Sequence, residues 1–212
     1  MAQNHERDLT LLAATNNKGK LIEIREILAP YFGRIVSAKE AGIALDVDEN
    51  ADTFEGNALL KAEAFCRASG MPAVADDSGL CVDALNGEPG VYSARYMGAG
   101  HTDAERTEFV LQKLKDVPRE KRTARFVSAA VIVFPDGRKC SAVGTCEGMI
   151  AFSPAGSNGF GYDPVFVPEG ETRSFSQMSD EEKNAISHRG RAMRALAEKL
   201  LAKQWDDRKT IL

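Results

Sequence analysis

The first residues that could do chemistry lie in the loop from Thr15 to Lys20, which carries two amides, two lysines and a glycine. An apolar run typical of a buried strand precedes it, and a helical pattern begins at Leu21 and closes at Pro30. A helix N-terminus favours a phosphate, and Lys20 adds a full charge. Leu21 stands where a P-loop needs Ser or Thr. The loop is therefore a candidate phosphate site of another kind, and an ordinary loop with solvated lysines is the alternative.

Two adjacent carboxylates, Asp76 and Asp77, follow the apolar run 72–75, and the pattern predicts a strand that ends at them. Neighbouring side chains of a strand point to opposite sides, so we expect different roles for the two. Mg²⁺ takes one or two carboxylates plus substrate phosphates, and a cation would relieve the repulsion between adjacent acids. Plain turn chemistry of Asp-Asp-Ser-Gly is the alternative. Further acids, Asp46, Asp48 and Glu49, lie earlier in the chain, just before a helix predicted to start at Asp52 or Thr53.

The segment 156–164, GSNGFGYDP, combines glycines with two aromatic residues. Glycine lets the backbone approach a flat ligand closely, and an aromatic face suits base stacking. The segment lacks the third glycine and the following helix of a dinucleotide motif, and a long structural turn is the alternative.

A last group of polar residues, Lys183 with Ser187-His188-Arg189, brings together a hydroxyl, an imidazole and two cations. Such a group suits an anion or a base edge. The alternative is a set of solvated basic residues on a helix.

The elements that must position these residues alternate between strands and helices. We predict strands at 34–38 and 80–84, a helix from Asp52 or Thr53 to near Gly70, a helix at 103–115, and a hairpin of 124–134 with 139–147. A capping box at 179–182 and an amphipathic helix through Leu200 follow. The hairpin makes the sheet at least partly antiparallel, so the fold class is mixed α/β.

Composition limits the classes of protein that fit. The chain has 212 residues, 43% of them hydrophobic, which is enough for one large domain or two packed lobes. A net charge of -4 disfavours a long nucleic-acid groove. No stretch approaches the roughly 18 apolar residues of a membrane span, and the polar start lacks a signal peptide. Four irregularly spaced cysteines fit reduced thiols, so we expect a cytoplasmic protein without nucleic-acid or membrane partners.

The motifs ATNNKGK, ADDSGL, GEPGVYSARY, NGFGYDP and EEKNAISHRG occur in this order, together with a helix that carries Asn57 and Lys61. From about Leu9 to Leu200, this arrangement resembles the inosine triphosphate pyrophosphatase family. The resemblance implies hydrolysis of non-standard purine nucleoside triphosphates (ITP, dITP, XTP) to the monophosphate and pyrophosphate, which removes them from the nucleotide pool.

The resemblance also implies an α/β fold with a mixed, elongated central sheet, whose flanking helices form two lobes around a nucleotide cleft. It further implies Mg²⁺ and a homodimer. We expect a single domain of two lobes over residues 9–203, a flexible N-terminus at 1–8 and a solvated tail at 204–212.

Matched position by position, the resemblance makes Asp77 the catalytic acid, assisted by Lys20 and Lys61. Glu49 and Asp77 would bind the metal, with Asp48 as the alternative to Glu49, and Asp76 would support from behind. Phe160 would stack on the base. The full set of implied substrate-binding residues is Thr15, Asn16, Asn17, Lys18, Gly19, Lys20, Ser78, Phe160, Gly161, Tyr162, Asp163, Lys183, Ser187, His188 and Arg189. Ser157-Asn158 departs from the Thr-Gly of many relatives and removes none of these groups.

Two other functions stay open at this point. One is a nucleotide-binding regulatory protein that does not hydrolyse its ligand. The other is a related pyrophosphatase that acts on other modified nucleotides.

Overall fold

The computed structural model describes residues 9–202. The predictions for residues 1–8, 203 and 204–212 lie outside these described residues. The chain divides into two compact units. Within the described residues, unit 1 contains 9–77, 128–144 and 189–202, and unit 2 contains 78–127 and 145–188.

The strands form one sheet in the order β2-β1-β3-β4-β5-β6. Their bounds are β1 Thr10–Ala13, β2 Arg34–Ser37, β3 Ala73–Val82, β4 Thr123–Val133, β5 Lys139–Ile150 and β6 Phe166–Pro168. β1 pairs in parallel with β2 and with β3, whereas β5 pairs antiparallel with β6. The sheet is therefore mixed, and the predicted fold class is confirmed.

The helices have bounds close to those that the sequence predicts. They are α1 Lys18–Leu28, α2 Phe54–Ser69, α3 Asp103–Lys113, α4 Asp180–Ile186 and α5 His188–Leu201. Short 3-10 helices lie at Asp83–Leu85, Gly90–Arg95, Arg119–Lys121 and Phe175–Gln177. None of the helices in the described chain is both long and apolar enough to cross a membrane.

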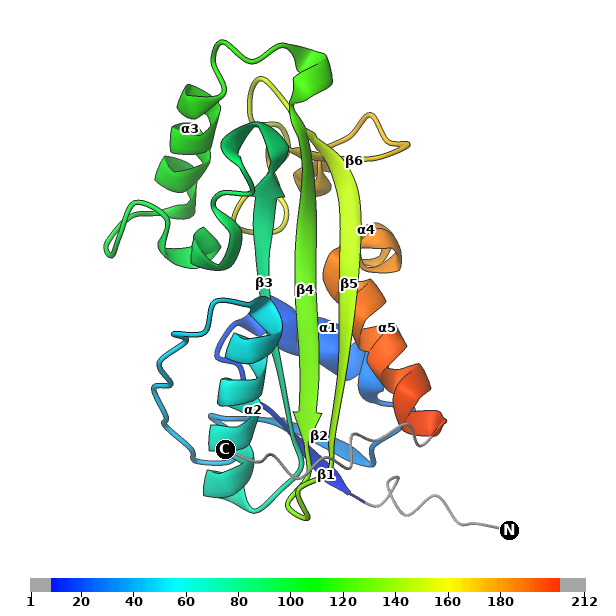
Figure 1. Ribbon diagram of the computed structural model, residues 1–212. Coiled ribbons are helices and arrows are strands. Elements are labelled where there is room, and N and C mark those ends of the chain that lie inside the picture. Colours follow the sequence, from blue (N-terminus) through cyan, green and yellow to red (C-terminus); the bar gives the residue numbers. More distant parts are fainter. Residues whose placement is uncertain (1–8, 203–212) are drawn as a thin grey trace. The chain divides into compact units, whose positions relative to one another are not determined.

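The strands of unit 1 carry apolar side chains on both faces. Leu11, Ala13 and Val74 belong to one core cluster, with residues of α1 and α5. Leu12, Ala14 and residues of α2 belong to the other. Figure 1 shows α2 on one side of these strands and α1 with α5 on the other. Successive side chains of a strand therefore meet different helices.

Local signals explain where the helices of unit 1 begin and end. The Asn17 side chain accepts a hydrogen bond from the backbone N–H of Lys20 and caps α1. The helix begins at Lys18, three residues before the predicted start at Leu21. Thr53 caps α2 through the N–H of Gly56. Gly70 ends α2 in the left-handed conformation, at φ 66°, which glycine adopts without steric cost.

Unit 2 has its own aromatic core. Phe126 lies 4.7 Å from Phe166 and 6.0 Å from Phe175 between ring centroids. Leu80 and Val82 of β3 and Val110 of α3 complete this cluster. Because the core draws on β3, α3 and the 162–178 segment, it anchors the chain at Tyr162 and Val165, just before β6.

Two predicted boundaries are wrong. Asp76 and Asp77 do not end a strand, because β3 continues without interruption from Ala73 to Val82. Pairing with β4 within the sheet overrides the turn preference of Asp-Asp-Ser-Gly. The C-terminal helical segment is also divided, because Ser187 is extended at ψ 155° between α4 and α5. The break puts His188 and Arg189 in the first turn of a new helix.

Arg122 joins three segments of unit 2 through its guanidinium. This side chain is 1% exposed and donates hydrogen bonds to the backbone carbonyls of Leu114, Ile150 and Ala151, at 2.7 to 2.9 Å. Burial lowers the pKa of Arg122 below its usual value. Arg122 therefore satisfies carbonyls at the end of α3 and the end of β5.

Arg122→Met is expected to lower the free energy of unfolding by about 3 kcal/mol, because buried carbonyls lose charged donors while the volume is nearly kept. Urea denaturation measures the change. Arg119→Met, at an exposed arginine of the same loop, is the matched control and should change stability by less than about 0.5 kcal/mol. Equal stability of the two variants would contradict this role of Arg122.

Candidate active site

The loop after β1 is held in place by its own side chains. The backbone N–H of Asn17 donates to the Thr15 hydroxyl at 3.1 Å, and Asn17 caps the helix. Asn16 and Lys18 are exposed, and Gly19 is half-buried. The loop therefore presents polar side chains at the N-terminus of α1, as the phosphate interpretation requires.

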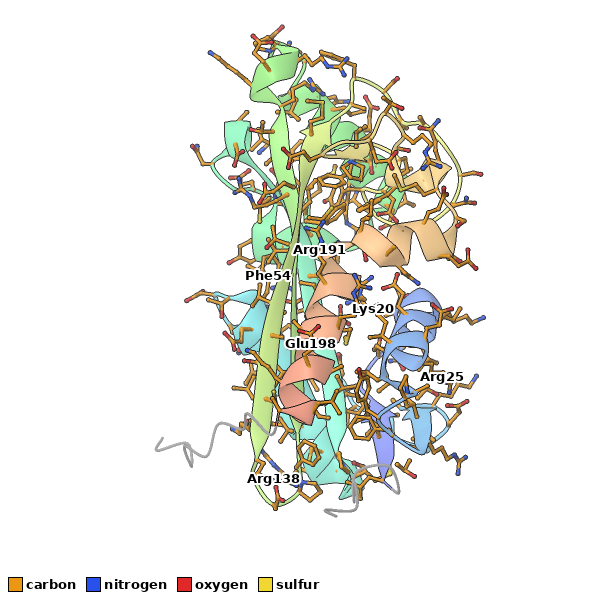
Figure 2. The ribbon with its side chains drawn as sticks, turned by 90° about the vertical axis from the view of Figure 1, so that its right-hand side faces the viewer. Lys20, Arg25, Phe54, Arg138, Arg191 and Glu198 are labelled. Atoms are coloured by element: carbon orange, nitrogen blue, oxygen red, sulfur yellow. The ribbon has the colours of Figure 1, made fainter. Side chains whose placement is uncertain are left out.

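Lys20 is the first member of a network of ion pairs on the α1 and α5 side of unit 1. Its Nζ lies 3.0 Å from Asp76 Oδ2, and the same oxygen accepts a bond from Arg189 Nε at 2.9 Å. Arg189 Nη1 lies 2.8 Å from Glu23 Oε2 of α1. In Figure 2, Lys20 lies at the start of α1 beside α5. Two cations and two carboxylates thus alternate along this network.

The network shifts the ionisation of its members. Burial alone would raise the pKa of Asp76, but Lys20 and Arg189 outweigh it and hold that pKa well below its usual range. Burial lowers the pKa of Lys20, and the nearby charges of Arg189 and Lys61 act in the same direction while Asp76 opposes them. Asp76 is therefore an anion whose charge is committed to Lys20 and Arg189.

Asp77 faces the other side of the strand. Its Oδ2 accepts a hydrogen bond at 3.0 Å from the Nδ2 of Asn57, a fully buried residue of α2. Lys61, one helical turn further along α2, pairs with Glu49 at 2.6 Å. The side chains of Asp76 and Asp77 thus point to opposite sides of the strand, since one meets α1 and α5 and the other meets α2. The different roles expected for the two acids stay a prediction.

The pKa of Asp77 is raised, chiefly by burial and also by the negative charge of Glu49, while Asn57 and Lys61 oppose the rise. Two carboxylates that repel each other are a setting that a divalent cation stabilises. Within residues 9–202 no group of three or more His, Cys, Asp or Glu side chains forms a metal site. Mg²⁺ needs only one or two protein carboxylates when phosphates and water supply the other ligands, so Glu49 and Asp77 fit it.

A polar pocket of about 240 Å³ in unit 1 brings several of these residues together. Its lining includes Thr15, Asn16, Asn17, Lys20, Asp46, Glu49 and Lys61. Asp48 is exposed and does not appear among the lining residues. The pocket therefore combines loop amides, one hydroxyl, two ammonium groups and two carboxylates, which is suited to a phosphate chain with a cation.

Unit 2 contains the Gly-rich segment, which is built around Asp163. Asp163 Oδ2 accepts from the backbone N–H of Phe160 at 2.9 Å and from Lys183 Nζ at 2.7 Å. A Cβ on Gly159 would lie 2.2 Å from Asp163 Oδ2, so this position requires glycine. The Lys183 ammonium lies 4.9 Å from the centroid of the Phe160 ring. A buried donor and a partly exposed aromatic face thus lie together.

The other predicted base-binding residues occupy less open positions. Tyr162 is in the core of unit 2, with its hydroxyl donating to the Ser93 carbonyl at 3.0 Å, and burial raises its pKa. His188 stacks on Phe126 at 4.6 Å, and Ser187 ends α4 with 1% exposure. Further positions are Ser78, half-buried in β3, and Gly161, whose N–H donates to Asp103. The contacts of all these residues with a substrate stay predictions. The same holds for Arg189, whose guanidinium is bound to Asp76 and Glu23 in unit 1.

Sequence reasoning did not single out Glu23 or assign a role to Asn57. Glu23 follows Lys20 by three positions and stands next to the apolar Ile24, on the buried side of α1. An acid on the apolar side of a helix is unusual, and this was the signal in the sequence that could have identified it. Asn57 is 0% exposed, and its Oδ1 accepts from the N–H of Ala51. It therefore fixes both the approach to α2 and the carboxylate of Asp77.

Comparison with known proteins supplies the family. A family model described as the Ham1 family matches residues 11–199. The dITP/XTP pyrophosphatase of Streptomyces coelicolor is 48% identical over 190 residues, which cover 88% of this chain and 94% of that protein. A Bacillus cereus protein of the same name is 45% identical over 192 residues, which cover 90% of this chain and 94% of that protein.

A solved structure agrees with these relatives. The Staphylococcus aureus Ham1 protein has a TM-score of 0.82 at 40% identity, covering 92% of this chain and 99% of that one. The resemblance drawn from the motifs is therefore confirmed. Since the family model spans most of the sequence and these relatives match it over nearly their whole length, the chain belongs to the Ham1 family.

Proposed function

We propose that this protein is a nucleoside triphosphate pyrophosphatase that hydrolyses ITP, dITP and XTP to the monophosphate and pyrophosphate. The names of its relatives, dITP/XTP pyrophosphatase, support this substrate class. The observation that carries the proposal is the polar pocket of unit 1, where Lys20, Lys61 and Glu49 line the same cavity and Glu49 influences the ionisation of Asp77. A site that only bound nucleotide would not need the buried Asp77 carboxylate.

Lys20 and Lys61 bind the triphosphate and offset the charge that develops on it. Each ammonium is held by a carboxylate, Lys20 by Asp76 at 3.0 Å and Lys61 by Glu49 at 2.6 Å. Charged groups that are already oriented stabilise a transition state without reorganising during the reaction. The polar loop at the N-terminus of α1 adds hydrogen-bond donors to the same phosphates.

Hydrolysis forms a bond from a water oxygen to the α-phosphorus and breaks the bond from that phosphorus to the oxygen bridging the α- and β-phosphates. Asp77 orients the water, and Asn57 fixes the Asp77 carboxylate through its bond of 3.0 Å. The products are nucleoside monophosphate and pyrophosphate. Glu49 and Asp77 would hold Mg²⁺, which when bound supplies polarisation of the phosphate oxygens.

Base selectivity is assigned to unit 2. Phe160 offers a stacking surface, and Lys183, which is 4% exposed, is a buried donor beside it. Hypoxanthine and xanthine carry an acceptor at C6 that such a donor satisfies, whereas the amino group of adenine would face donor with donor. Guanine shares the acceptor at C6, so its exclusion must involve its amino group at position 2. A site built to hydrogen-bond a substrate group rejects an analogue that leaves its buried polar atoms unpaired.

The proposal also covers the setting of the enzyme. It acts in the cytoplasm as a homodimer, without nucleic-acid or membrane partners. All four cysteines are free thiols, and the net charge is -4, which supports a reducing compartment and a ligand other than nucleic acid. The dimer rests on the family resemblance, and sedimentation of the purified protein tests it.

Incubation of purified protein with Mg²⁺ and, separately, ITP, XTP, ATP or GTP tests the function. We expect monophosphate and pyrophosphate from ITP and XTP, with ATP and GTP largely spared, as resolved by ion-exchange chromatography. Removal of the divalent cation with EDTA should abolish turnover, and added Mg²⁺ should restore it. Bound but unhydrolysed ITP would instead favour a regulatory protein, and turnover of other modified nucleotides alone would favour a related pyrophosphatase.

Asp77→Asn is expected to lower kcat for ITP roughly a hundredfold or more, because the amide cannot replace the charge that orients water and cation. The fold should persist, since the amide has nearly the size of the carboxylate. Asp136→Asn, in the exposed turn between β4 and β5, is the matched control and should keep full activity. Normal turnover by the Asp77→Asn variant would remove this residue from the chemistry.

Lys20→Met is expected to lower kcat/KM for ITP by at least about tenfold, because the variant loses a charge that offsets charge developing on the phosphates. Steady-state kinetics with ITP measures the effect. Lys39→Met, at an exposed lysine, serves as the control. A kcat/KM equal to that of the control would show that Lys20 serves Asp76 alone and not the substrate.

A further inference from the structure

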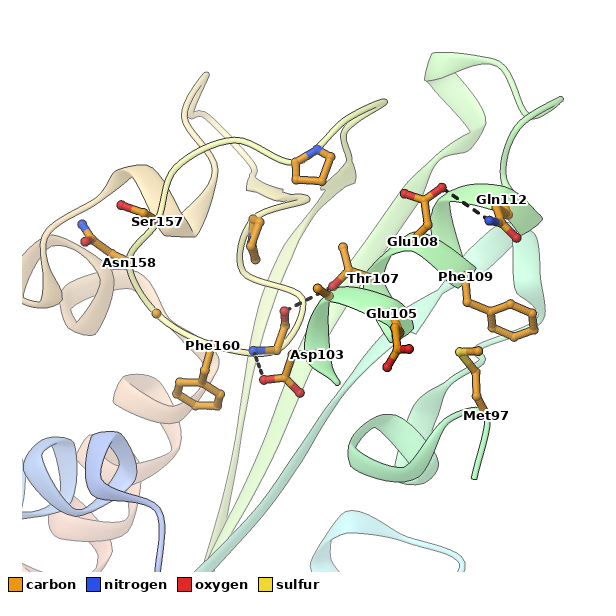
Figure 3. Close-up of a pocket in the computed structure, with 15 residues that line it drawn as sticks. Met97, Asp103, Glu105, Thr107, Glu108, Phe109, Gln112, Ser157, Asn158 and Phe160 are labelled. Carbon is orange, nitrogen blue, oxygen red and sulfur yellow. Dashed lines mark hydrogen bonds between the residues drawn. The ribbon is translucent and has the colours of Figure 1, made fainter. Parts of the chain in front are cut away.

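The aromatic residue assigned to stack on the base, Phe160, lies on a loop whose backbone is held from outside the loop by α3. The N–H of Gly161 donates to Asp103 Oδ2 at 2.9 Å, and the carbonyl of Gly161 accepts from the Thr107 hydroxyl at 3.3 Å. Figure 3 shows both bonds reaching the chain beside Phe160. One turn of α3 therefore contacts both polar groups of the residue that follows the aromatic ring.

These two bonds complete the fixation of the loop around Phe160. Within the loop, Asp163 accepts from the N–H of Phe160 at 2.9 Å and donates its own N–H to the carbonyl of Phe160 at 3.3 Å. With Asp103 and Thr107 acting on Gly161, the peptide groups on both sides of Phe160 have fixed partners. The ring direction then depends on the position of α3.

The contacts of α3 are themselves ordered. Thr107 is 3% exposed, and the helix begins with a capping box of Thr102 and Glu105. The second carboxylate oxygen of Asp103, Oδ1, pairs with Arg106 Nη1 at 3.1 Å. Arg106 thus orients the carboxylate so that Oδ2 meets Gly161.

The surroundings explain why an outside support is needed. A cavity of about 840 Å³ in unit 2 is lined by residues of α3 on one side and of the 157–161 loop on the other. Phe160 is 37% exposed, so packing by itself does not fix the loop. In this open region, the two hydrogen bonds to Gly161 join α3 to the loop.

We propose that Asp103 and Thr107 are positioning residues for substrate selection, which set the orientation of the Phe160 ring by holding the peptide groups of Gly161. The proposal rests on the proposed function, in which Phe160 stacks on the base. An ordered stacking surface lowers the entropic cost of binding the base. Asp103 and Thr107 therefore strengthen binding of the nucleoside part without touching the reacting phosphates.

Asp103→Ala is expected to raise KM for ITP about three- to tenfold, the range that one net hydrogen bond represents. The value of kcat should stay within about twofold, because this bond acts equally on bound substrate and transition state. Asp103→Asn keeps an oxygen that accepts from Gly161 and should lie close to wild type, although it loses the charge opposite Arg106. Glu108→Ala, on the same helix and cavity, is the control and should leave KM unchanged.

Two Thr107 variants test the hydrogen bond from the Thr107 hydroxyl to the Gly161 carbonyl. Thr107→Val removes the hydroxyl at nearly constant volume and should raise KM for ITP. Thr107→Ser keeps the hydroxyl and should have a KM close to that of the wild type. In a Phe160→Ala background, Asp103→Ala should change KM by less than about twofold, because contacts that act through one group are not additive.

Three results would overturn the proposal. They are an unchanged KM in Asp103→Ala, equal impairment of Asp103→Asn and Asp103→Ala, and a full effect of Asp103→Ala without the Phe160 ring. Calorimetric titration with inosine monophosphate tests the positioning role separately from the proposed function, because binding of this ligand requires no hydrolysis. Weaker binding in Asp103→Ala supports the positioning role even if the wild type does not turn over ITP. Equal binding by wild type and variant, with ITP hydrolysed normally, overturns the positioning role alone.

Discussion

The alternation of side chains along β3 is the constraint on which the candidate site depends. Because neighbouring residues of an extended strand face opposite sides, Asp76 meets α1 and α5 while Asp77 meets α2. A carboxylate on each side allows one acid to pair with two cations while the other lies beside a different helix and a different set of polar groups. A shift of the strand by one residue would exchange these surroundings, which is why the register of β3 matters more than any single contact.

The pKa values of the two acids shift in opposite directions. This difference fits a structural role for Asp76 and the chemical role proposed for Asp77. Lys20 and Arg189 hold the pKa of Asp76 low, so its charge orders the elements around it. Burial raises the pKa of Asp77, and Glu49 adds to the rise. Removal of one partner from a buried ion pair costs about 3–5 kcal/mol, so the Asp76 network is a structural requirement of the site as well as an electrostatic one.

The part of unit 2 that is proposed to bind the base is ordered in a similar way, with hydrogen bonds in place of most of the charges. Asp163 accepts from the Phe160 backbone and from Lys183, so one carboxylate orders both the aromatic face and the donor beside it. Asp103 and Thr107 reach the same loop from α3. In both units, then, residues that would contact substrate are held in place by neighbouring polar and charged side chains.

The sequence by itself determined the local elements and the family. Apolar periodicity and capping residues located α1, α2, α3 and the β4–β5 hairpin, since these signals act between residues close in the chain. The motifs pointed to Lys20, Lys61, Asp77 and Glu49. Only the tertiary structure decided that β3 runs through Asp76 and Asp77, that Ser187 divides the last helices, and that Glu23 and Asn57 support the site. The contacts of Asn57 with Asp77 and of Glu23 with Arg189 join residues 20 and 166 positions apart, and local propensity carries no information about such distant partners.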